Sequence, residues 1–97
     1  MCYDASLPPK KKFSLGQIVA TPNAINTIAP DEVLRALARH ARGDWGTMEK
    51  EDWNANEQAL QHGGRLFSVY YSVQEVKFWI ITESDRSATT VLLPEDY

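Results

Sequence analysis

A cluster of charged and hydroxyl side chains near the end of the chain has the composition of an anion-binding site. It runs from Thr82 to Ser87 and lies between the apolar runs 79–81 and 91–94. Apolar runs joined by so short a polar segment predict a tight turn between buried strands, which would hold its polar groups in one geometry. Arg65 and Arg86, together with nearby hydroxyl groups, would then bind a phosphate or a carboxylate.

The same residues have a plain structural interpretation. Glu83 and Arg86 flank one turn and would form a surface ion pair worth less than about 1 kcal/mol. The threonines of this region, Thr82, Thr89 and Thr90, are frequent in strands because their branched side chains suit a pleated surface. The sequence leaves both interpretations open.

His40 is the main candidate for acid–base chemistry. It follows Leu37 by three positions and Val33 by seven, which places it on or near the inward face of a helix. An imidazole there would serve as a general base toward a ligand between helix and sheet. The alternative is a partly buried histidine bound to a backbone carbonyl or to Asp44. A catalytic set would combine His40 with Arg65 and Arg86, which would hold a phosphate, and with Thr82 or Thr90, which would orient it.

Two further places hold groups that need partners. Asp44 and Trp45 lie in a glycine-flanked turn, where Trp45 can fold back on the core and Asp44 can orient His40 or cap the next segment. Asn56 lies within the apolar arc of the second predicted helix, where a polar side chain must find a hydrogen-bond partner. The predicted binding residues are therefore Asp44, Trp45, Asn56, Thr82, Glu83, Arg86 and Thr89.

The chain shows no pattern of metal or cofactor ligands. His40 and His62 are far apart in the sequence, and the single cysteine, Cys2, lies near its start. There is no glycine-rich phosphate loop and no nucleophile elbow. We therefore expect neither a metal nor a cofactor.

The elements that would position these residues follow from helix signals and hydrophobic periodicity. Pro30 and the acids after it predict a helix over about 30–42, and Thr47 precedes a second over about 48–62. A short strand at 17–20 and a helical turn near 23–28 come earlier. Three runs rich in aromatic and branched residues predict an antiparallel meander over about 65–72, 76–83 and 88–93. The predicted class is α+β, with the two main helices on one side of a three-stranded sheet.

The length of the chain limits the number of domains it can form, and its net charge limits the kinds of partner it can bind. The 97 residues suffice for one domain, which we expect over 13–97 after a disordered basic tail at 1–12. From Phe13 onward seven Lys and Arg stand against twelve Asp and Glu, which gives −5. This balance makes a protein partner more favoured than nucleic acid. No apolar run is long enough to span a membrane and no secretory signal is visible, so a cytoplasmic location is expected.

Three stretches carry a resemblance to a known family. They are 16–22 (GQIVATP), 40–46 (HARGDWG) and, most specifically, 79–94 from Trp79 to Pro94. In these stretches, which span most of the chain from about Ser14 onward, the sequence is similar to short uncharacterised bacterial proteins that are often labelled plasmid-related. It departs from their usual pattern at Ser84 and at 73–75. The resemblance implies a setting in mobile bacterial elements and supplies no activity.

These observations favour a small non-enzymatic accessory protein, associated with plasmids or phages, that binds a macromolecular partner. Inhibition of a defence enzyme or a nucleic-acid-handling enzyme would fit, because an acidic surface can occupy a basic cleft. The alternative is a metal-independent ribonuclease-like toxin in which His40 is the base and arginines hold the phosphate. If Tyr70 and Trp79 lie on an exposed sheet face, that face would serve as a surface for a homodimer or for another partner.

Overall fold

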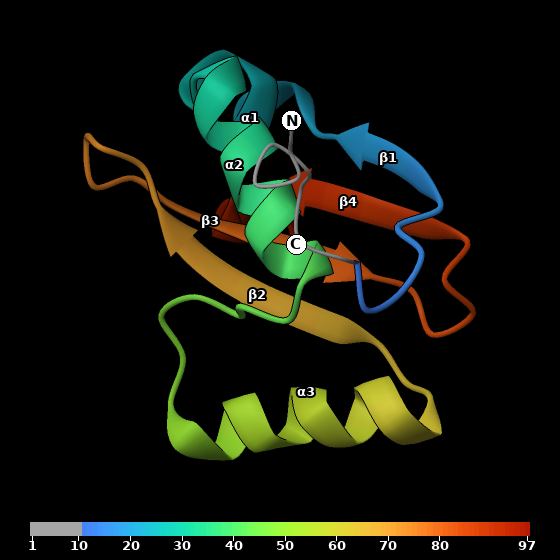
Figure 1. The fold of residues 1–97 in the computed structure, drawn as a ribbon. Helices are drawn as coiled ribbons and strands as arrows, with labels where there is room; N and C mark the ends of the chain where they lie inside the picture. Colours follow the sequence, from blue (N-terminus) through green and yellow to red (C-terminus); the bar gives the residue numbers. More distant parts are fainter. Residues whose placement is uncertain (1–10) are drawn as a thin grey trace, which may run out of the picture.

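The computed structural model describes residues 11–97, so Cys2 and most of the predicted basic tail lie outside the described part of the chain. The elements, in order, are β1 (Gln17–Ala20), α1 (Pro22–Thr27), α2 (Pro30–Ala41), α3 (Lys50–His62), β2 (Leu66–Tyr71), β3 (Lys77–Thr82), β4 (Ala88–Leu92) and the 3-10 turn η2 (Pro94–Asp96) (Figure 1). The α+β class is confirmed, and the bounds of the two main helices lie within two residues of those predicted.

The four strands form one mixed sheet in the order β1-β4-β3-β2 (Figure 1). Strands β2, β3 and β4 are antiparallel neighbours, as the meander requires. β1 pairs in parallel with β4, from Gln17 opposite Ala88 to Ala20 opposite Val91. The prediction of a three-stranded, purely antiparallel sheet is therefore wrong. Short connections reveal only strands that follow one another closely, whereas a parallel pair needs a long crossover connection.

Helix α2 packs across one face of the sheet (Figure 1). It begins with Pro30, and Asp31 and Glu32 in its first turn stabilise the positive end of the helix dipole. The shorter α1 is capped by the Thr21 hydroxyl, which accepts from the N–H of Ala24 at 3.1 Å. The core between helices and sheet consists of Ala24, Ile28, Ala36, Leu37, Tyr70, Phe78, Ile80, Val91 and Leu93.

Helix α3 lies beside β2 at the edge of the sheet (Figure 1). The buried side chain of Asn56 donates to the C=O of Phe67 at 2.6 Å and accepts from its N–H at 3.1 Å. The loop before α3 adds two backbone bonds to Val69, one from the N–H of Thr47 and one to the C=O of Trp45. The chain therefore covers this edge of the sheet along Phe67 and Val69 without a further strand.

Tyr70 and Trp79 lie on opposite faces of the sheet. Tyr70 is opposite Phe78 in the β2–β3 register, and both are buried beneath α2. Trp79 follows Phe78, so it points to the other face, where its ring packs 4.9 Å from that of Phe67. A single exposed face carrying Tyr70 and Trp79 does not exist. Alternation along a strand gives the relative faces of its residues, but the register between strands decides which of them face the helix.

Candidate functional site

His40 is fully buried at the C-terminal end of α2. Its Nδ1 atom lies 2.5 Å from the Oγ of Ser68 in β2, and its Nε2 atom lies 2.9 Å from the Oγ1 of Thr82 in β3. The partners of the imidazole are thus two strand hydroxyls, in place of the carbonyl or the Asp44 carboxylate that the sequence suggested. Both ring nitrogens are occupied by the protein itself.

The hydrogen bonds around His40 form one continuous chain. The hydroxyl oxygens of Thr82 and Thr89 are 2.7 Å apart, and the Thr89 hydroxyl donates to the C=O of Leu15 at 2.6 Å. Because each hydroxyl has a single hydrogen, this last bond sets the direction of the bonds to Thr82. Thr82 donates to Thr89, and the Nε2–H of His40 donates to Thr82. The network therefore fixes a proton on Nε2. Burial keeps the imidazole neutral, so its Nδ1 accepts from Ser68.

Burial lowers the pKa of His40 to about 3, and the positive charge of Arg86 contributes to the same shift. Two aromatic rings pack edge-to-face against the imidazole, with ring centres 5.3 Å away for Phe13 and 5.5 Å away for Trp45. A general base must lie within hydrogen-bond reach of the substrate proton. His40, enclosed and fully bonded, is arranged as part of the core.

Arg86 binds backbone carbonyls, although the sequence suggested it as a phosphate ligand. Its Nη1 donates to the C=O of Gly64 at 2.6 Å and contacts those of Glu83 and Ser84, while Nη2 donates to Ala59 at 3.1 Å. Backbone carbonyls at the C-terminal end of a helix form the negative end of its dipole and attract a cation. The guanidinium thus joins the end of α3 to the turn after β3. The N–H groups that would have to bind an anion already donate to these carbonyls.

The other two catalytic candidates are not placed with His40. Arg65 is half exposed and its Nε lies 3.5 Å from the carboxylate of Glu83. Thr90 lies opposite Ile81, next to the buried Thr89 in β4, so its side chain is on the far face of the sheet from the His40 network. The structure therefore brings Thr82 and Thr89 to His40, but neither Arg65 nor Thr90.

Asp44 and Trp45 have partners that the sequence did not identify. The Asp44 carboxylate accepts from Arg39 through Nε at 2.8 Å and Nη2 at 3.3 Å, and from the N–H of Gly46. The Arg39 hydrogen bond is the largest cause that holds the pKa of Asp44 below its ordinary value. Trp45 is fully buried, and its indole N–H donates to Glu57 at 2.8 Å.

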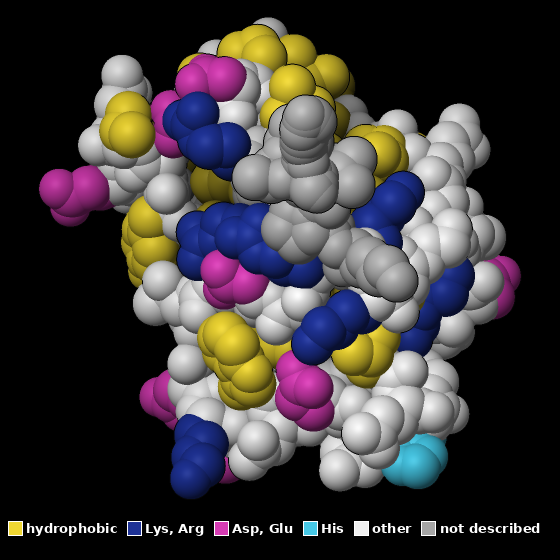
Figure 2. All heavy atoms as spheres, viewed as in Figure 1, with side chains coloured by type: hydrophobic (Ala, Val, Ile, Leu, Met, Phe, Trp, Pro, Cys, Tyr) yellow, Lys and Arg dark blue, Asp and Glu magenta, His cyan; other side chains and the backbone are white. Residues whose placement is uncertain are grey.

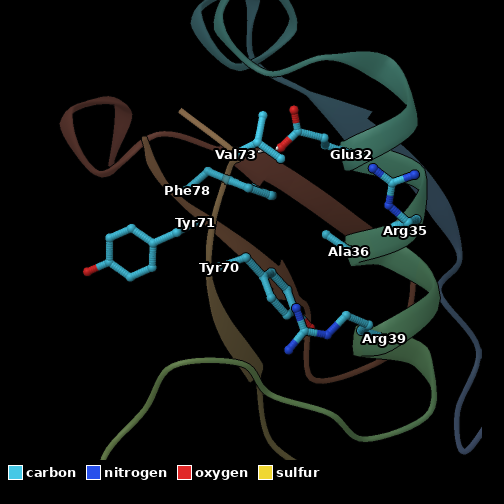
Figure 3. Close-up of a pocket in the computed structure, with 8 residues that line it drawn as sticks. All are labelled: Glu32, Arg35, Ala36, Arg39, Tyr70, Tyr71, Val73 and Phe78. Atoms are coloured by element: carbon cyan, nitrogen blue, oxygen red, sulfur yellow. Dashed lines mark hydrogen bonds between the residues drawn. The ribbon is translucent and has the colours of Figure 1, made fainter. Parts of the chain in front are cut away.

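A hollow of about 250 Å³ lies between α2 and the β2–β3 hairpin, and the sequence did not predict it (Figure 3). Arg39 lies over the ring of Tyr70, with its guanidinium carbon 4.8 Å from the ring centre. Figure 3 shows the arginines coming from the helix and the aromatic floor coming from the strands. The hollow is lined by Glu32, Arg35, Ala36, Arg39, Tyr70, Tyr71, Val73 and Phe78.

Four cations form a band along the exposed side of α2, which we call the basic band: Lys12, Arg35, Arg39 and Arg42. The three arginines follow one another at spacings of four and three, so they share one side of the helix. The side chain of Lys12 lies beside Gly43, just past the helix end. Figure 2 shows dark blue side chains gathered across this part of the surface. The arginine spacing was visible in the sequence, but the hollow beside it depends on β2 and β3.

Comparison of the chain with protein-family models, with curated proteins and with solved structures gives no match. The resemblance to plasmid-related bacterial proteins therefore stays a prediction.

Two findings on residues 11–97 concern ligands and membranes. No group of three or more His, Cys, Asp or Glu side chains in this part of the chain is arranged to hold a metal ion. None of its helices is both long enough and apolar enough to cross a bilayer. The expectation that the protein works without a metal or a cofactor stays a prediction.

Proposed function

We propose that this chain is a non-enzymatic protein that binds a partner protein through the basic band and the hollow beside it. The observation that carries the proposal is the fixed position of Arg39, which stacks on Tyr70 at 4.8 Å and is bonded twice to Asp44. Arginine and tyrosine are the residue types that most often dominate binding energy at protein interfaces. An arginine held in place before binding loses little further freedom when a partner docks.

The size of the hollow suits a partner side chain. Sites for small-molecule ligands usually measure about 300–1,000 Å³, and this hollow measures about 250 Å³. The exposed side chain of Val73 at its rim would contact the aliphatic part of an inserted side chain, above the buried rings of Tyr70 and Phe78. Arg35 at its rim, whose pair with Asp31 is exposed and therefore weak, would meet a carboxylate, for which the planar guanidinium is the preferred partner.

A protein fits the charge of this surface better than a nucleic acid does. Two of the band's arginines already have acidic partners, since Arg35 lies 3.1 Å from Asp31 and Arg39 lies 2.8 Å from Asp44. Affinity for nucleic acid grows with the number of phosphates that free cations neutralise, and the chain as a whole carries −3. An acidic patch on a folded protein can be bound by fewer free cations than a nucleic-acid backbone requires. That the partner is a defence enzyme or a nucleic-acid-handling enzyme stays a prediction.

The ribonuclease-like alternative has less support from the geometry. It needs His40 as a base beside arginines that hold a phosphate. His40 is enclosed, with a pKa of about 3, and Arg86 is bonded to carbonyls. The Nδ1 lone pair of the neutral imidazole already accepts a hydrogen bond from the Ser68 hydroxyl. The imidazole therefore offers no acceptor to a ribose hydroxyl.

Affinity purification with charge-matched baits tests the proposal. The double variant Arg35→Glu/Arg42→Glu reverses two charges of the basic band and leaves the Arg39–Asp44 pair intact. The control Lys50→Glu/Lys77→Glu changes the net charge by the same amount at exposed positions on α3 and β3. We expect a protein other than the chain itself to be retained by the natural sequence and the control, and at least tenfold less by the band variant.

A second readout separates binding from catalysis. The purified chain should leave single-stranded and structured RNA intact over long incubation. Cleavage of RNA that disappears in His40→Gln would contradict the proposal, and so would equal retention of every captured protein by both double variants.

A further inference from the structure

The outer edge of β1 offers backbone hydrogen-bonding groups that no residue of 11–97 uses. The N–H groups of Gln17 and Thr21 point toward β4, where each donates to a backbone carbonyl at 3.0 Å. Because the direction of these groups alternates along a strand, the N–H and C=O groups of Ile18 and Ala20 point away from the sheet. Such an edge is a template for a further strand.

An apolar groove runs beside this edge. It has a volume of about 310 Å³ and lies between β1 and the helices α1 and α2. Three side chains at its rim, Ile18, Ile25 and Leu34, are 52%, 61% and 67% exposed. With Val19 they make up four of the seven large hydrophobic side chains exposed in the described chain, a concentration typical of an interaction surface. The lining is uncharged: Ile18, Ala20, Ala24, Ile25, Ile28, Pro30, Val33, Leu34 and Leu37.

The opposite edge of the same sheet is covered along Phe67 and Val69. At β2 the outward N–H and C=O groups of Phe67 bind the side chain of Asn56, and those of Val69 bind the backbone of the 45–47 loop. β1 has no such cover among residues 11–97, and its sequence from Gln17 to Ala20 contains neither lysine nor proline. Both residues are common means of discouraging edge pairing. The contrast points to β1 as the edge that takes another chain.

We propose that two copies of this chain associate through β1, antiparallel about a two-fold axis at Val19, to form one continuous eight-stranded sheet. In this register Ile18 of each copy pairs with Ala20 of the other, and both residues have their backbone groups directed outward. Each such pair exchanges two N–H···O=C bonds. Val19 then faces Val19 of the second copy as the non-hydrogen-bonded pair at the axis. The interface uses the same patch on both copies, as a two-fold dimer requires.

Charge does not oppose a second copy at this place, because the groove that would meet it is uncharged. Two copies that each carry −3 repel one another, and this repulsion is least where uncharged surfaces meet. The proposed register sets Ile18 of one copy beside Ala20 of the other on the side of the sheet that bears the grooves. Each groove therefore receives an apolar side chain from the other copy, and Ile25 and Leu34 border the joined strands. This inference does not rest on the proposed function, which uses another side of α2.

Sedimentation velocity of the full chain, from low micromolar to submillimolar concentration, tests the association. We expect a species of twice the 11.0 kDa chain mass. Ile18→Pro, which removes one outward N–H, and Leu34→Asp, which places a charge in the groove, should each weaken dimerisation at least tenfold. Val73→Asp, at an 80% exposed position on the β2–β3 hairpin, is the matched control and should remain dimeric. Circular dichroism checks that each variant is folded.

A disulfide test reads the register directly. In a Cys2→Ser background, Val19→Cys would bring two thiols together at the axis, where facing Cα atoms lie about 4.5 Å apart, within the range that a disulfide spans. Mild oxidation should link Val19→Cys chains much faster than Val73→Cys chains. A natural chain that stays monomeric throughout the concentration range would overturn the proposal. So would dimers that persist in both folded interface variants, or equal crosslinking at the two positions.

Discussion

The Nδ1 atom of His40 lies 2.5 Å from the hydroxyl oxygen of Ser68, inside the protein and beneath the ring of Phe13. The imidazole and the hydroxyls that it binds are the residue types of a catalytic site, yet here they link α2 to three strands. A buried polar network of this kind stabilises one arrangement only if every member is bonded. The consequences can be measured as stability, pH dependence and hydrogen exchange.

The buried His40 should make the fold sensitive to mild acid. The pKa of its imidazole is near 6.5 in an unfolded chain and about 3 in the folded protein, so between these values the unfolded state binds more protons. Stability is therefore complete above pH 6.5 and is lost as the pH falls toward 3, by about 1.4 kcal/mol per pH unit. Urea denaturation at pH 7 and pH 5 should differ by about 2 kcal/mol.

His40→Gln is the control for this pH dependence. It should flatten the curve between pH 6.5 and 5, because carboxylates such as Asp44, whose pKa is lowered from 3.8, lose their stabilising effect only in stronger acid. If the variant is too unstable to measure, NMR titration of the imidazole in the natural chain gives the same answer. A pKa near 6.5 in the folded state would contradict the enclosed network.

Arg86→Lys should destabilise the protein by about 2 kcal/mol. The guanidinium reaches carbonyls both at the end of α3 (Ala59 and Gly64) and in the turn after β3 (Ser84), and a single ammonium cannot match that span. Arg65→Lys is the matched control, because Arg65 is half exposed and pairs with Glu83 at 3.5 Å. We expect it to change stability by less than about 1 kcal/mol.

The same two variants separate a structural arginine from an anion ligand. If Arg86 held a phosphate, added phosphate would raise the melting temperature of the natural chain and leave that of Arg86→Lys unchanged. We expect no stabilisation of either protein by phosphate. Equal destabilisation by the two arginine substitutions would argue against the carbonyl-binding role.

Asn56→Asp should cost about 3 kcal/mol although it changes few atoms. The amide of Asn56 donates to the C=O of Phe67, and a carboxylate oxygen in its place would face that carbonyl without a hydrogen. Asn54→Asp, at an exposed position on the same helix, should stay within about 0.5 kcal/mol. Hydrogen exchange at the Phe67 amide should accelerate only in the first variant. Similar effects at the two positions would count against the edge-covering role.

Gly46→Ala and Gly63→Ala should differ in their effects on stability. Both glycines have positive φ, +81° and +93°, so both substitutions strain the backbone. A Cβ at Gly46 would also meet the carbonyl oxygen of Val69, where the loop approaches β2 too closely for any side chain, whereas a Cβ at Gly63 meets nothing within 4 Å. We expect a loss of about 1–3 kcal/mol for Gly63→Ala and a clearly larger loss, or failure to fold, for Gly46→Ala. Chemical denaturation measures both, and a milder effect at Gly46 would refute the close approach.

Local signals were enough to predict much of the fold. Pro30 with the acids that follow it gave the start of α2, and runs of aromatic and branched residues gave β2, β3 and β4 to within a residue or two. These features depend on neighbours in the chain, through dihedral preference, helix capping and hydrophobic periodicity. Asn56 could also be recognised as a polar group in need of partners, but the sequence could not name the strand that supplies them.

The sequence by itself determined the helices, the strand segments including the one at 17–20, and the residue types from which any site must be built. Tertiary structure alone decided that β1 joins β4, that His40 meets hydroxyls 28 and 42 positions away, and that Arg86 turns to carbonyls. It also created the hollow beside Arg39 and left β1 at an open edge. Contacts between residues so far apart in the sequence depend on how whole elements pack. That packing is set by the register and the buried faces of all the strands together.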